Sequence, residues 1–288
     1  MAESLETLRE KINEILATPM DEMFKEQIES LPTKLNEFGF DDFGFSPEWV
    51  KYALLPVAWF YKFYFRVEAH GLQNIPEGRV LLISNHSGQI PIDGLMIGTS
   101  LFLEGDPPRM CRSMIDRFVT SLPYVSTFLT RVGQILGAPE NARALLEKEE
   151  ALLVFPEGTR GINKLFWDRY KLVDFGPGFM RLALETNTPI VPVAVIGAEE
   201  QLPSFGNLRR LGKLFGVPTI PVMPQLIVPL LGWAPLPVKY RLYFGEPIRF
   251  KGDSNDEDSV IEKKVEKVRQ QIQSMITFGL KSRKRVFW

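Results

Sequence analysis

Short apolar runs alternate with longer segments of helical periodicity from Gly71 onward, and this alternation limits the fold more than any other feature of the chain. Four runs have the length and composition of buried strands: Arg79–Ser84, Ala151–Phe155, Ile190–Ile196 and Tyr240–Gly245. Helical periodicity marks three segments between them: Pro91–Glu104, Asn141–Glu150 and Phe179–Thr186. Strands that alternate with helices predict the α/β class, with a central, mostly parallel sheet flanked by helices.

Both ends of the chain carry further helical patterns. Residues 4–31 are amphipathic, and Pro47–Val67 is crowded with aromatic residues, as expected of a buried helix or of a helix at a membrane interface. Asp258–Phe278 repeats apolar residues every three or four positions, and Ser254 with Glu257 predicts a capping box in front of it. We therefore expect three regions: an N-terminal helical region over residues 1–66, an α/β domain over 67–250, and a C-terminal amphipathic helix with a basic tail over 251–288.

The composition excludes several classes of protein. With 45% hydrophobic and 24% charged residues among 288, the chain is globular rather than disordered. Its 34 basic and 35 acidic residues give a net charge of −1, so we expect no nucleic-acid partner. The single cysteine, Cys111, excludes a disulfide scaffold and a cysteine zinc cluster, and it fits a reducing intracellular compartment. We expect no metal site.

No segment has the properties of a membrane-spanning helix. The longest uncharged run, Leu214–Val238, is long enough to cross a bilayer but contains six prolines, which prevent a continuous helix. Residues 1–16 are too charged for a secretory signal. We expect a peripheral protein on the cytoplasmic face of a membrane, with three candidate membrane contacts: Tyr52–Val67, Leu214–Val238 and the basic segment Lys281–Arg285.

His86 and Asp93 follow the predicted strand Arg79–Ser84. Ligands of α/β proteins bind at the carboxyl ends of the strands, so a histidine in this loop can reach a substrate. An aspartate at the start of the next helix can accept a hydrogen bond from one imidazole nitrogen and leave the other nitrogen as a general base. From the residues alone a second interpretation stays open, in which His86 makes an ordinary backbone hydrogen bond and Asp93 caps the helix.

A second polar block, Phe155-Pro-Glu-Gly-Thr-Arg-Gly161, comes at the end of the strand predicted over Ala151–Phe155. Gly158 allows the backbone to approach a ligand closely, and Thr159 and Arg160 are donors suited to phosphate-like oxygens. Pro-Glu-Gly is also an ordinary turn sequence. By itself this block indicates either a turn or an anion site.

The two polar blocks and the Pro-containing strand Ile190–Val193 together resemble the glycerophospholipid (lysophosphatidate-type, 1-acylglycerol-3-phosphate) acyltransferase superfamily. The superfamily has an Asn-His…Asp block, here Asn85-His86…Asp93, followed by Phe-Pro-Glu-Gly-Thr-Arg. The order and spacing are similar from residue 67 to residue 250. The resemblance implies that His86 and Asp93 are catalytic. It also implies a substrate-binding set made of Glu157, Gly158, Thr159 and Arg160.

The spacing of the first block departs from the superfamily pattern. Six residues separate His86 from Asp93 where the family has four. Gly88 and Pro91 are suited to a bulge that absorbs the extra two residues. We therefore expect a bacterial-type branch with a longer His-to-Asp loop.

The arginine that is expected to bind the acceptor phosphate is also missing from its usual position. Pro139 stands where the family usually has an arginine that binds the phosphate of the acceptor. Two explanations stay open. Either Arg131 or Arg143 takes over this role, or the acceptor is neutral.

The predicted function is that of an O-acyltransferase. Such an enzyme moves a fatty acyl group from acyl-CoA, or from acyl-carrier protein, to a hydroxyl of a lysophospholipid or another glycerolipid, with His86 as the general base. No residue has the features of an acyl-enzyme nucleophile, so we expect direct transfer, with acyl-CoA as co-substrate and no further cofactor. Two alternatives stay open: a neutral acceptor such as diacylglycerol, and a non-catalytic lipid-binding protein on the same fold.

Overall fold

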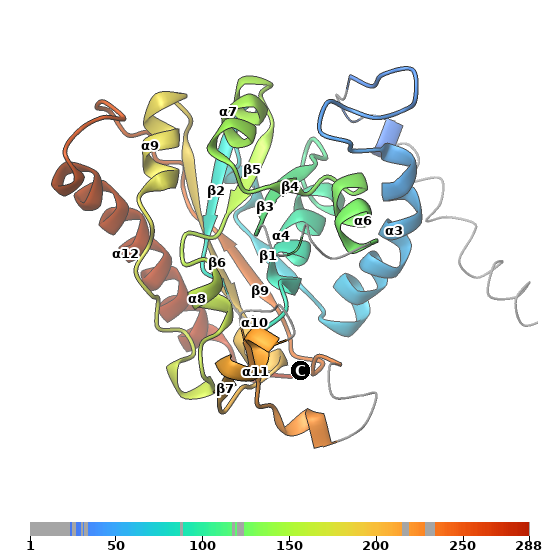
Figure 1. Cartoon of the computed structure of the whole chain (residues 1–288), viewed down its shortest axis with the longest axis vertical. Helices are drawn as coiled ribbons and strands as arrows, with labels where there is room; N and C mark the ends of the chain where they lie inside the picture. Colours follow the sequence, from blue (N-terminus) through green and yellow to red (C-terminus); the bar gives the residue numbers. More distant parts are fainter. Residues whose placement is uncertain are drawn as a thin grey trace, which may run out of the picture.

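A seven-stranded sheet runs through the molecule, with helices on both of its faces (Figure 1). The computed structural model describes residues 24, 27–29, 31, 34–86, 89–116, 119, 124–214, 219–227 and 234–287. The strands of the sheet are β1 (Glu68–His70), β2 (Val80–Ser84), β3 (Cys111–Ile115), β4 (Ile135–Leu136), β5 (Ala151–Val154), β6 (Ile190–Ile196) and β9 (Arg241–Phe244). A separate antiparallel pair consists of β7 (Asn207–Leu208) and β8 (Ile220–Pro221).

The order of the strands is β1-β9-β6-β2-β5-β3-β4. All neighbouring pairs are parallel except β6 with β9. In the centre Ile83 of β2 lies opposite Val154 of β5 on one side and Pro192 of β6 on the other. The carboxyl ends of these three strands therefore meet at one edge of the sheet. The predicted α/β class with a mostly parallel sheet is confirmed.

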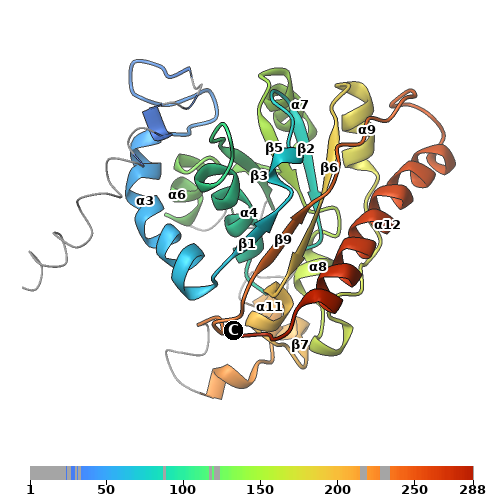
Figure 2. The same cartoon turned by 180° about the vertical axis from the view of Figure 1, so that it is seen from behind.

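Helices cover both faces of this sheet (Figures 1 and 2). One face carries α7 (Pro139–Glu147), α9 (Gly178–Glu185) and α12 (Asp258–Ser282). The other carries α4 (Ile92–Leu103) and the π-helix η1 (Phe60–Tyr64), and α3 (Pro47–Trp59) packs outside α4. The remaining helices are short: α6 (Val125–Arg131), α8 (Thr159–Ile162), α10 (Ala198–Gln201), α11 (Arg209–Leu214), and the 3₁₀ turns η2 (Leu72–Asn74), η3 (Phe166–Asp168) and η4 (Pro224–Ile227).

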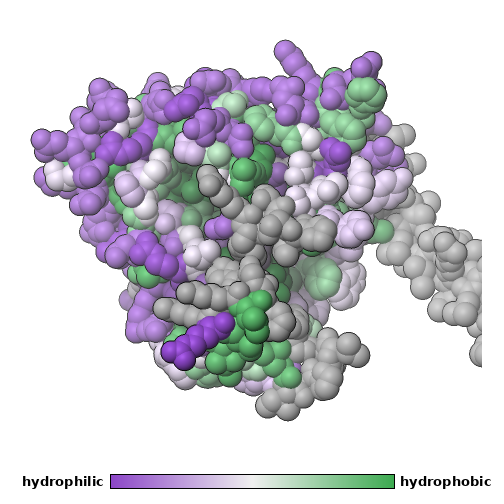
Figure 3. All heavy atoms as spheres, in the orientation of Figure 1, coloured by the Kyte–Doolittle hydropathy of each residue, from purple (hydrophilic) through white to green (hydrophobic). Residues whose placement is uncertain are grey.

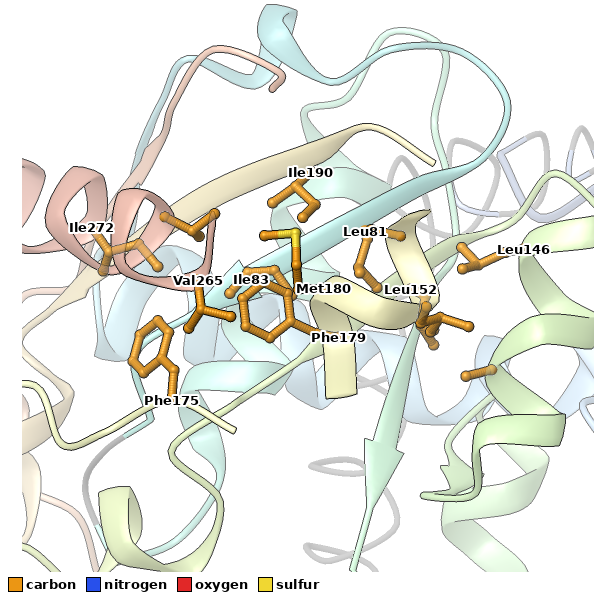
Figure 4. Close-up of a cluster of buried hydrophobic side chains, with 14 of the residues drawn as sticks. Leu81, Ile83, Leu146, Leu152, Phe175, Phe179, Met180, Ile190, Val265 and Ile272 are labelled. Atoms are coloured by element: carbon orange, nitrogen blue, oxygen red, sulfur yellow. The ribbon is translucent and has the colours of Figure 1, made fainter. Parts of the chain in front are cut away.

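Figure 4 shows the core between the sheet and helices α9 and α12. Leu81 and Ile83 of β2 face Met180 of α9 and Val265 of α12 in this core. Leu82, between them in the sequence, belongs to the core on the opposite face, with α4. Because β2 is buried on both faces, it is a continuous apolar run rather than an alternating one, as expected of a central parallel strand.

The four predicted strands are present, and their ends differ from the prediction by at most one residue. The sequence pattern does not reveal β1, β3 or β4. Two of these strands have only two or three residues, and β3 carries the polar residues Arg112 and Ser113. The edge strands β1 and β4, and β3 between β4 and β5, form because their neighbours offer backbone hydrogen bonds, not because of their own periodicity.

The helix predicted over Asp258–Phe278 is present and continues to Ser282. The predicted capping box is wrong, because Glu257 itself is the N-cap residue and makes no side-chain capping bond. Ser254 instead lies in the preceding turn, where its carbonyl accepts a hydrogen bond from Arg181. The helix predicted over residues 4–31 falls largely outside the described residues. None of the helices among the described residues is both long enough and apolar enough to span a bilayer.

Candidate active site

The side chain of Asn85 ends the main-chain pairing between β2 and β6, and the chain turns away from the sheet at His86. The Asn85 side chain accepts a hydrogen bond from the N–H of Val195 at 2.8 Å and donates one to the Val195 carbonyl oxygen at 3.1 Å. This side chain is fully buried. The two bonds of this side chain take the place of further main-chain hydrogen bonds between β2 and β6. The backbone therefore leaves the sheet at His86.

The structure brings His86 and Asp93 into direct contact. His86 Nδ1 lies 2.8 Å from Asp93 Oδ2. Asp93 is fully buried in the first turn of α4, and its Oδ1 accepts the N–H of Gly94 at 2.8 Å. Since a carboxylate only accepts hydrogen bonds, Nδ1 is the donor in this contact, and in a neutral ring Nε2 is then the acceptor. The ring also stacks on Phe155, with the two ring centroids 4.0 Å apart.

Glu157 lies under the backbone of His86 and is almost completely buried. Its Oε1 accepts the N–H of His86 at 3.0 Å, and its Oε2 accepts the N–H of Val173 at 2.9 Å. Lys164 Nζ lies 3.4 Å from the same Oε2. Both carboxylate oxygens are thus engaged by the protein. The structure places Glu157 as a support of His86, while its substrate-binding role stays a prediction.

Gly158, Thr159 and Arg160 lie at the carboxyl end of β5, between Glu157 and Gly161, which both lie next to His86. Gly158 has a positive φ of 57°, and its N–H donates to the Phe155 carbonyl oxygen at 3.0 Å, which closes a tight turn. Arg160 is exposed and donates to the carbonyl oxygen of Asp174 at 3.0 Å. Among the described residues no carboxylate pairs with it. An exposed guanidinium at this edge is suited to an anionic substrate group.

The two arginines considered as substitutes for the missing phosphate ligand are held elsewhere. Arg143 on α7 pairs with Glu185 of α9 at 2.7 Å. The helices α7 and α9 lead into the amino ends of β5 and β6, so this pair lies at the edge of the sheet opposite His86. Arg131 donates to the Gly44 carbonyl oxygen and stacks on Phe40 at 3.9 Å. Arg160 is the arginine of the predicted set that lies at the His86 edge.

Cys111 is unsuited to nucleophilic catalysis. The side chain is buried in β3, and this burial raises the pKa of the thiol to about 12, so it is protonated at neutral pH. Cys111 instead packs as a small apolar residue in the core on the α4 side of the sheet. Across the described ranges, no group of three or more His, Cys, Asp and Glu side chains is arranged to hold a metal ion.

A buried charged network behind His86 is not evident from the sequence. Lys164 Nζ lies 2.9 Å from Glu199 Oε1, and Glu199 Oε2 accepts the N–H of Tyr170 at 2.9 Å. Burial raises the pKa of Glu199 to about 7, against the lowering effect of Lys164. One signal could have identified Glu199: it follows the strand Ile190–Ile196, at the same edge as His86.

Three segments that the sequence marks as candidate membrane contacts come together in space. The hydroxyl of Tyr64, at the end of η1, donates to the Pro235 carbonyl oxygen at 2.6 Å. Arg66 Nη2 donates to the Pro237 carbonyl oxygen at 2.6 Å and also to the carbonyl oxygen of Phe287 in the basic tail. The α3–η1 segment, residues 234–240 and the C-terminal tail therefore form one continuous surface, which we call the tail surface.

A second apolar patch lies over α11 and β7, at the lower end of the molecule in Figure 3. Its exposed members are Leu208, Leu211, Leu214, Val222 and Leu226. Much of the predicted run Leu214–Val238 falls outside the described residues, including Leu231 and Trp233. The described part of the run is mixed, because Leu214, Val222 and Leu226 are exposed whereas Met223 and Val238 are buried in the core.

The fold and the two motif-bearing loops identify the class of this protein. A family model described as Acyltransferase matches residues 66–196, which run from just before β1 to the end of β6 and include His86, Asp93 and the Glu157–Arg160 block. The chain belongs to this acyltransferase family, as its motifs indicate.

The similarity extends over most of the chain in several relatives. An uncharacterized protein of Mycobacterium tuberculosis is 36% identical over 261 residues, covering 88% of this chain and 72% of the relative. A Gallus gallus protein named "DGAT1/2-independent enzyme synthesizing storage lipids" is 31% identical over 212 residues, covering 73% of this chain and 59% of that protein. The crystal structure of the 1-acyl-sn-glycerophosphate acyltransferase PlsC of Thermotoga maritima shares the fold, with a TM-score of 0.53, 20% identity and 82% coverage of both chains.

Proposed function

We propose that this acyltransferase moves a fatty acyl group from an acyl thioester, either acyl-CoA or acyl-carrier protein, to a hydroxyl of a lysophospholipid or another glycerolipid. The observation that carries the proposal is the 2.8 Å contact between His86 Nδ1 and Asp93 Oδ2. It lies at the carboxyl edge of the sheet, where α/β proteins bind ligands. His86 is the general base, and Asp93 orients it.

The reaction follows from this geometry. The acceptor hydroxyl gives its proton to His86 Nε2 as its oxygen attacks the thioester carbonyl carbon, and Asp93 stabilises the imidazolium that forms. The tetrahedral intermediate expels the thiolate of the donor, which takes the proton back from His86. The oxyanion requires N–H donors, and the turn Gly158–Arg160 beside His86 is the segment that we expect to supply them. With Cys111 buried and protonated, transfer is direct.

Two classes of acceptor fit the site. Arg160 favours a lysophospholipid, since its exposed guanidinium can bind a phosphate. A neutral acceptor such as diacylglycerol is the second candidate, because Pro139 replaces the usual arginine and because Arg131 and Arg143 are engaged elsewhere. The name of the Gallus gallus relative, which refers to storage lipids, points in the same direction.

The test compares the two histidines of the chain. His86→Ala should lose about 10²- to 10⁴-fold in turnover, the usual contribution of a general base. His70→Ala is the matched control, since His70 is exposed and stacks on Tyr243. Palmitoyl-CoA is the donor, with lysophosphatidate and diacylglycerol as acceptors. Turnover of His86→Ala above a tenth of the wild-type value would contradict the proposal. Wild-type protein that binds these lipids without transfer would favour the non-catalytic alternative.

We also propose that the protein acts at the cytoplasmic face of a membrane through the tail surface. Trp59 and Phe63 are exposed there, and Trp is a residue type that favours the membrane interface. Lys62, Lys284 and Arg285 are exposed nearby, and within the described part of the chain none of them has an ion-pair partner. Each cation near an anionic bilayer contributes about 1 kcal/mol.

Vesicle sedimentation tests the membrane proposal. Wild-type protein should bind vesicles of phosphatidylglycerol and phosphatidylcholine, and 1 M salt should weaken this binding without abolishing it. Phe63→Asp should release most of the protein. The control is Phe38→Asp, which changes an equally exposed phenylalanine in the turn before α3. Equal binding by both variants would exclude the tail surface, and no sedimentation of the wild type at any salt would indicate a soluble acceptor.

A further inference from the structure

Lys164 stands at the centre of the buried network behind His86. It lies in the loop after α8, and its side chain is 9% exposed. Its ammonium group is 2.9 Å from Glu199 Oε1, 3.4 Å from Glu157 Oε2 and 3.3 Å from the carbonyl oxygen of Lys171. The three N–H bonds of the ammonium group thus have three oxygen acceptors. Neither Lys164 nor Glu199 belongs to a motif that the sequence reveals.

Lys164 reaches the loop between His86 and Asp93 from two directions. Through Glu157, whose other oxygen accepts the N–H of His86 at 3.0 Å, it supports the start of the loop. Its own carbonyl oxygen accepts a hydrogen bond from Gln89 Nε2 at 3.1 Å, which holds the middle of the loop. Gln89 has a positive φ of 64°, a conformation that a non-glycine residue adopts only where its surroundings hold it.

We propose that Lys164 is a positioning residue for His86. Its ammonium group locks Glu157 under the His86 backbone, and this support, which Lys164→Met removes, keeps His86 Nδ1 in contact with Asp93. The carbonyl oxygen that holds Gln89 belongs to the main chain and stays in that variant. The inference rests on the proposed function, in which His86 is the base. Lys164 does not touch the reacting atoms. Its removal should therefore lower kcat and leave KM nearly unchanged.

The first test is kinetic. Lys164→Met removes the ammonium group with little change in volume, and a misplacement of about an ångström in a catalytic group costs about 10²-fold. We expect kcat to fall roughly 10- to 100-fold, with KM changed by less than about twofold. Lys171→Met is the matched control, because it removes an exposed side chain just after η3 and leaves the Lys171 carbonyl in place. A Lys164→Met variant with wild-type kcat overturns the inference.

The second test follows the imidazole directly and needs no substrate. The chain has two histidines, so proton NMR with ¹⁵N-labelled histidine gives two sets of ring signals, which His70→Ala and His86→Ala assign. Lys164→Met should shift or broaden the N–H signal of His86 and leave the His70 signals in place. Unchanged His86 signals overturn the inference.

A double variant separates positioning from charge balance. Lys164→Met leaves two buried carboxylates without a cation, and the variant can be too unstable to assay. Adding Glu199→Gln restores the net charge of the network to its original −1, so we expect stability to recover while kcat stays low. Recovery of kcat together with stability means that Lys164 only balances charge, which overturns the inference. A fully active His86→Ala variant would contradict the proposed function. The NMR measurement would still show whether Lys164 positions the His86 ring, because it needs no substrate.

Discussion

Replacing Glu199 by glutamine should change how the stability of the protein depends on pH. The side chain is almost fully buried, and its pKa is raised from 4.5 to about 7, mainly by burial. Glutamine has nearly the shape of the protonated acid and never ionises. The variant therefore isolates the cost of ionising this one carboxyl group.

The direction and the size of the change in stability with pH follow from proton linkage. Because the pKa is higher in the folded protein than in the unfolded chain, the folded protein binds more protons between pH 4.5 and pH 7. Its stability therefore falls as pH rises through this window. A rise in pKa from 4.5 to about 7 corresponds to roughly 3 kcal/mol, since each unit is worth about 1.4 kcal/mol. Lys164, 2.9 Å away, already offsets part of the cost and is included in that value.

Urea unfolding followed by tryptophan fluorescence measures the effect. At pH 4.5 the free energies of unfolding of wild type and Glu199→Gln should be similar, and by pH 8 the variant should have gained about 3 kcal/mol relative to wild type. Glu246→Gln, at an exposed loop position, is the control. Parallel curves for wild type and Glu199→Gln across this range would refute the reasoning, because Glu199 would then titrate alike in the folded and unfolded states.

Three further predictions concern the site. Asp93→Asn should keep a native circular dichroism spectrum and lose about 10²- to 10⁴-fold in turnover, since the imidazole loses its orienting carboxylate; unchanged turnover would point to another partner. Gly161→Ala places a Cβ 2.9 Å from the His86 carbonyl oxygen and should cost about 1–3 kcal/mol by thermal unfolding together with much of the activity. Gly178→Ala, where a Cβ meets nothing within 4 Å, should be neutral or slightly stabilising, and equal losses in both would exclude the steric explanation. Arg160→Lys should raise KM for lysophosphatidate and leave diacylglycerol unaffected, whereas equal losses for both acceptors would make the residue structural.

The class of fold could be predicted because the central strands are buried on both faces. That burial requires continuous apolar runs such as Ile190–Ile196, and the helices between them need periodic apolar faces. The strands outside the centre of the sheet, β1, β3 and β4, carry no such requirement. β3 includes Arg112, which is buried against Asp41 and Glu150, and this pairing depends on a loop about 70 residues away in the sequence.

In the candidate site, too, the sequence predicts some features and only the structure reveals others. His86, Asp93 and the block Glu157–Arg160 could be singled out because their chemistry is local: each follows an apolar strand and carries a motif. Sequence alone left two interpretations of His86 open. The tertiary structure shows that the two side chains are in contact, with Nδ1 2.8 Å from Asp93 Oδ2, and their catalytic roles stay a prediction.

The buried network that supports the site, formed by Glu157, Lys164 and Glu199, could be identified only from the tertiary structure. The motif marks Glu157 as a substrate-binding residue, which stays a prediction, and only the structure shows that it is buried under His86 with Lys164 beside it. Lys164 and Glu199 lie 35 residues apart and share no periodicity or motif, so no local pattern could pair them. They meet because β2, β5 and β6 are neighbours in the sheet, which brings the loops after all three strands to one edge. A buried charge at this edge is stable only beside an opposite charge. The order of the strands in space decides which residues form such pairs.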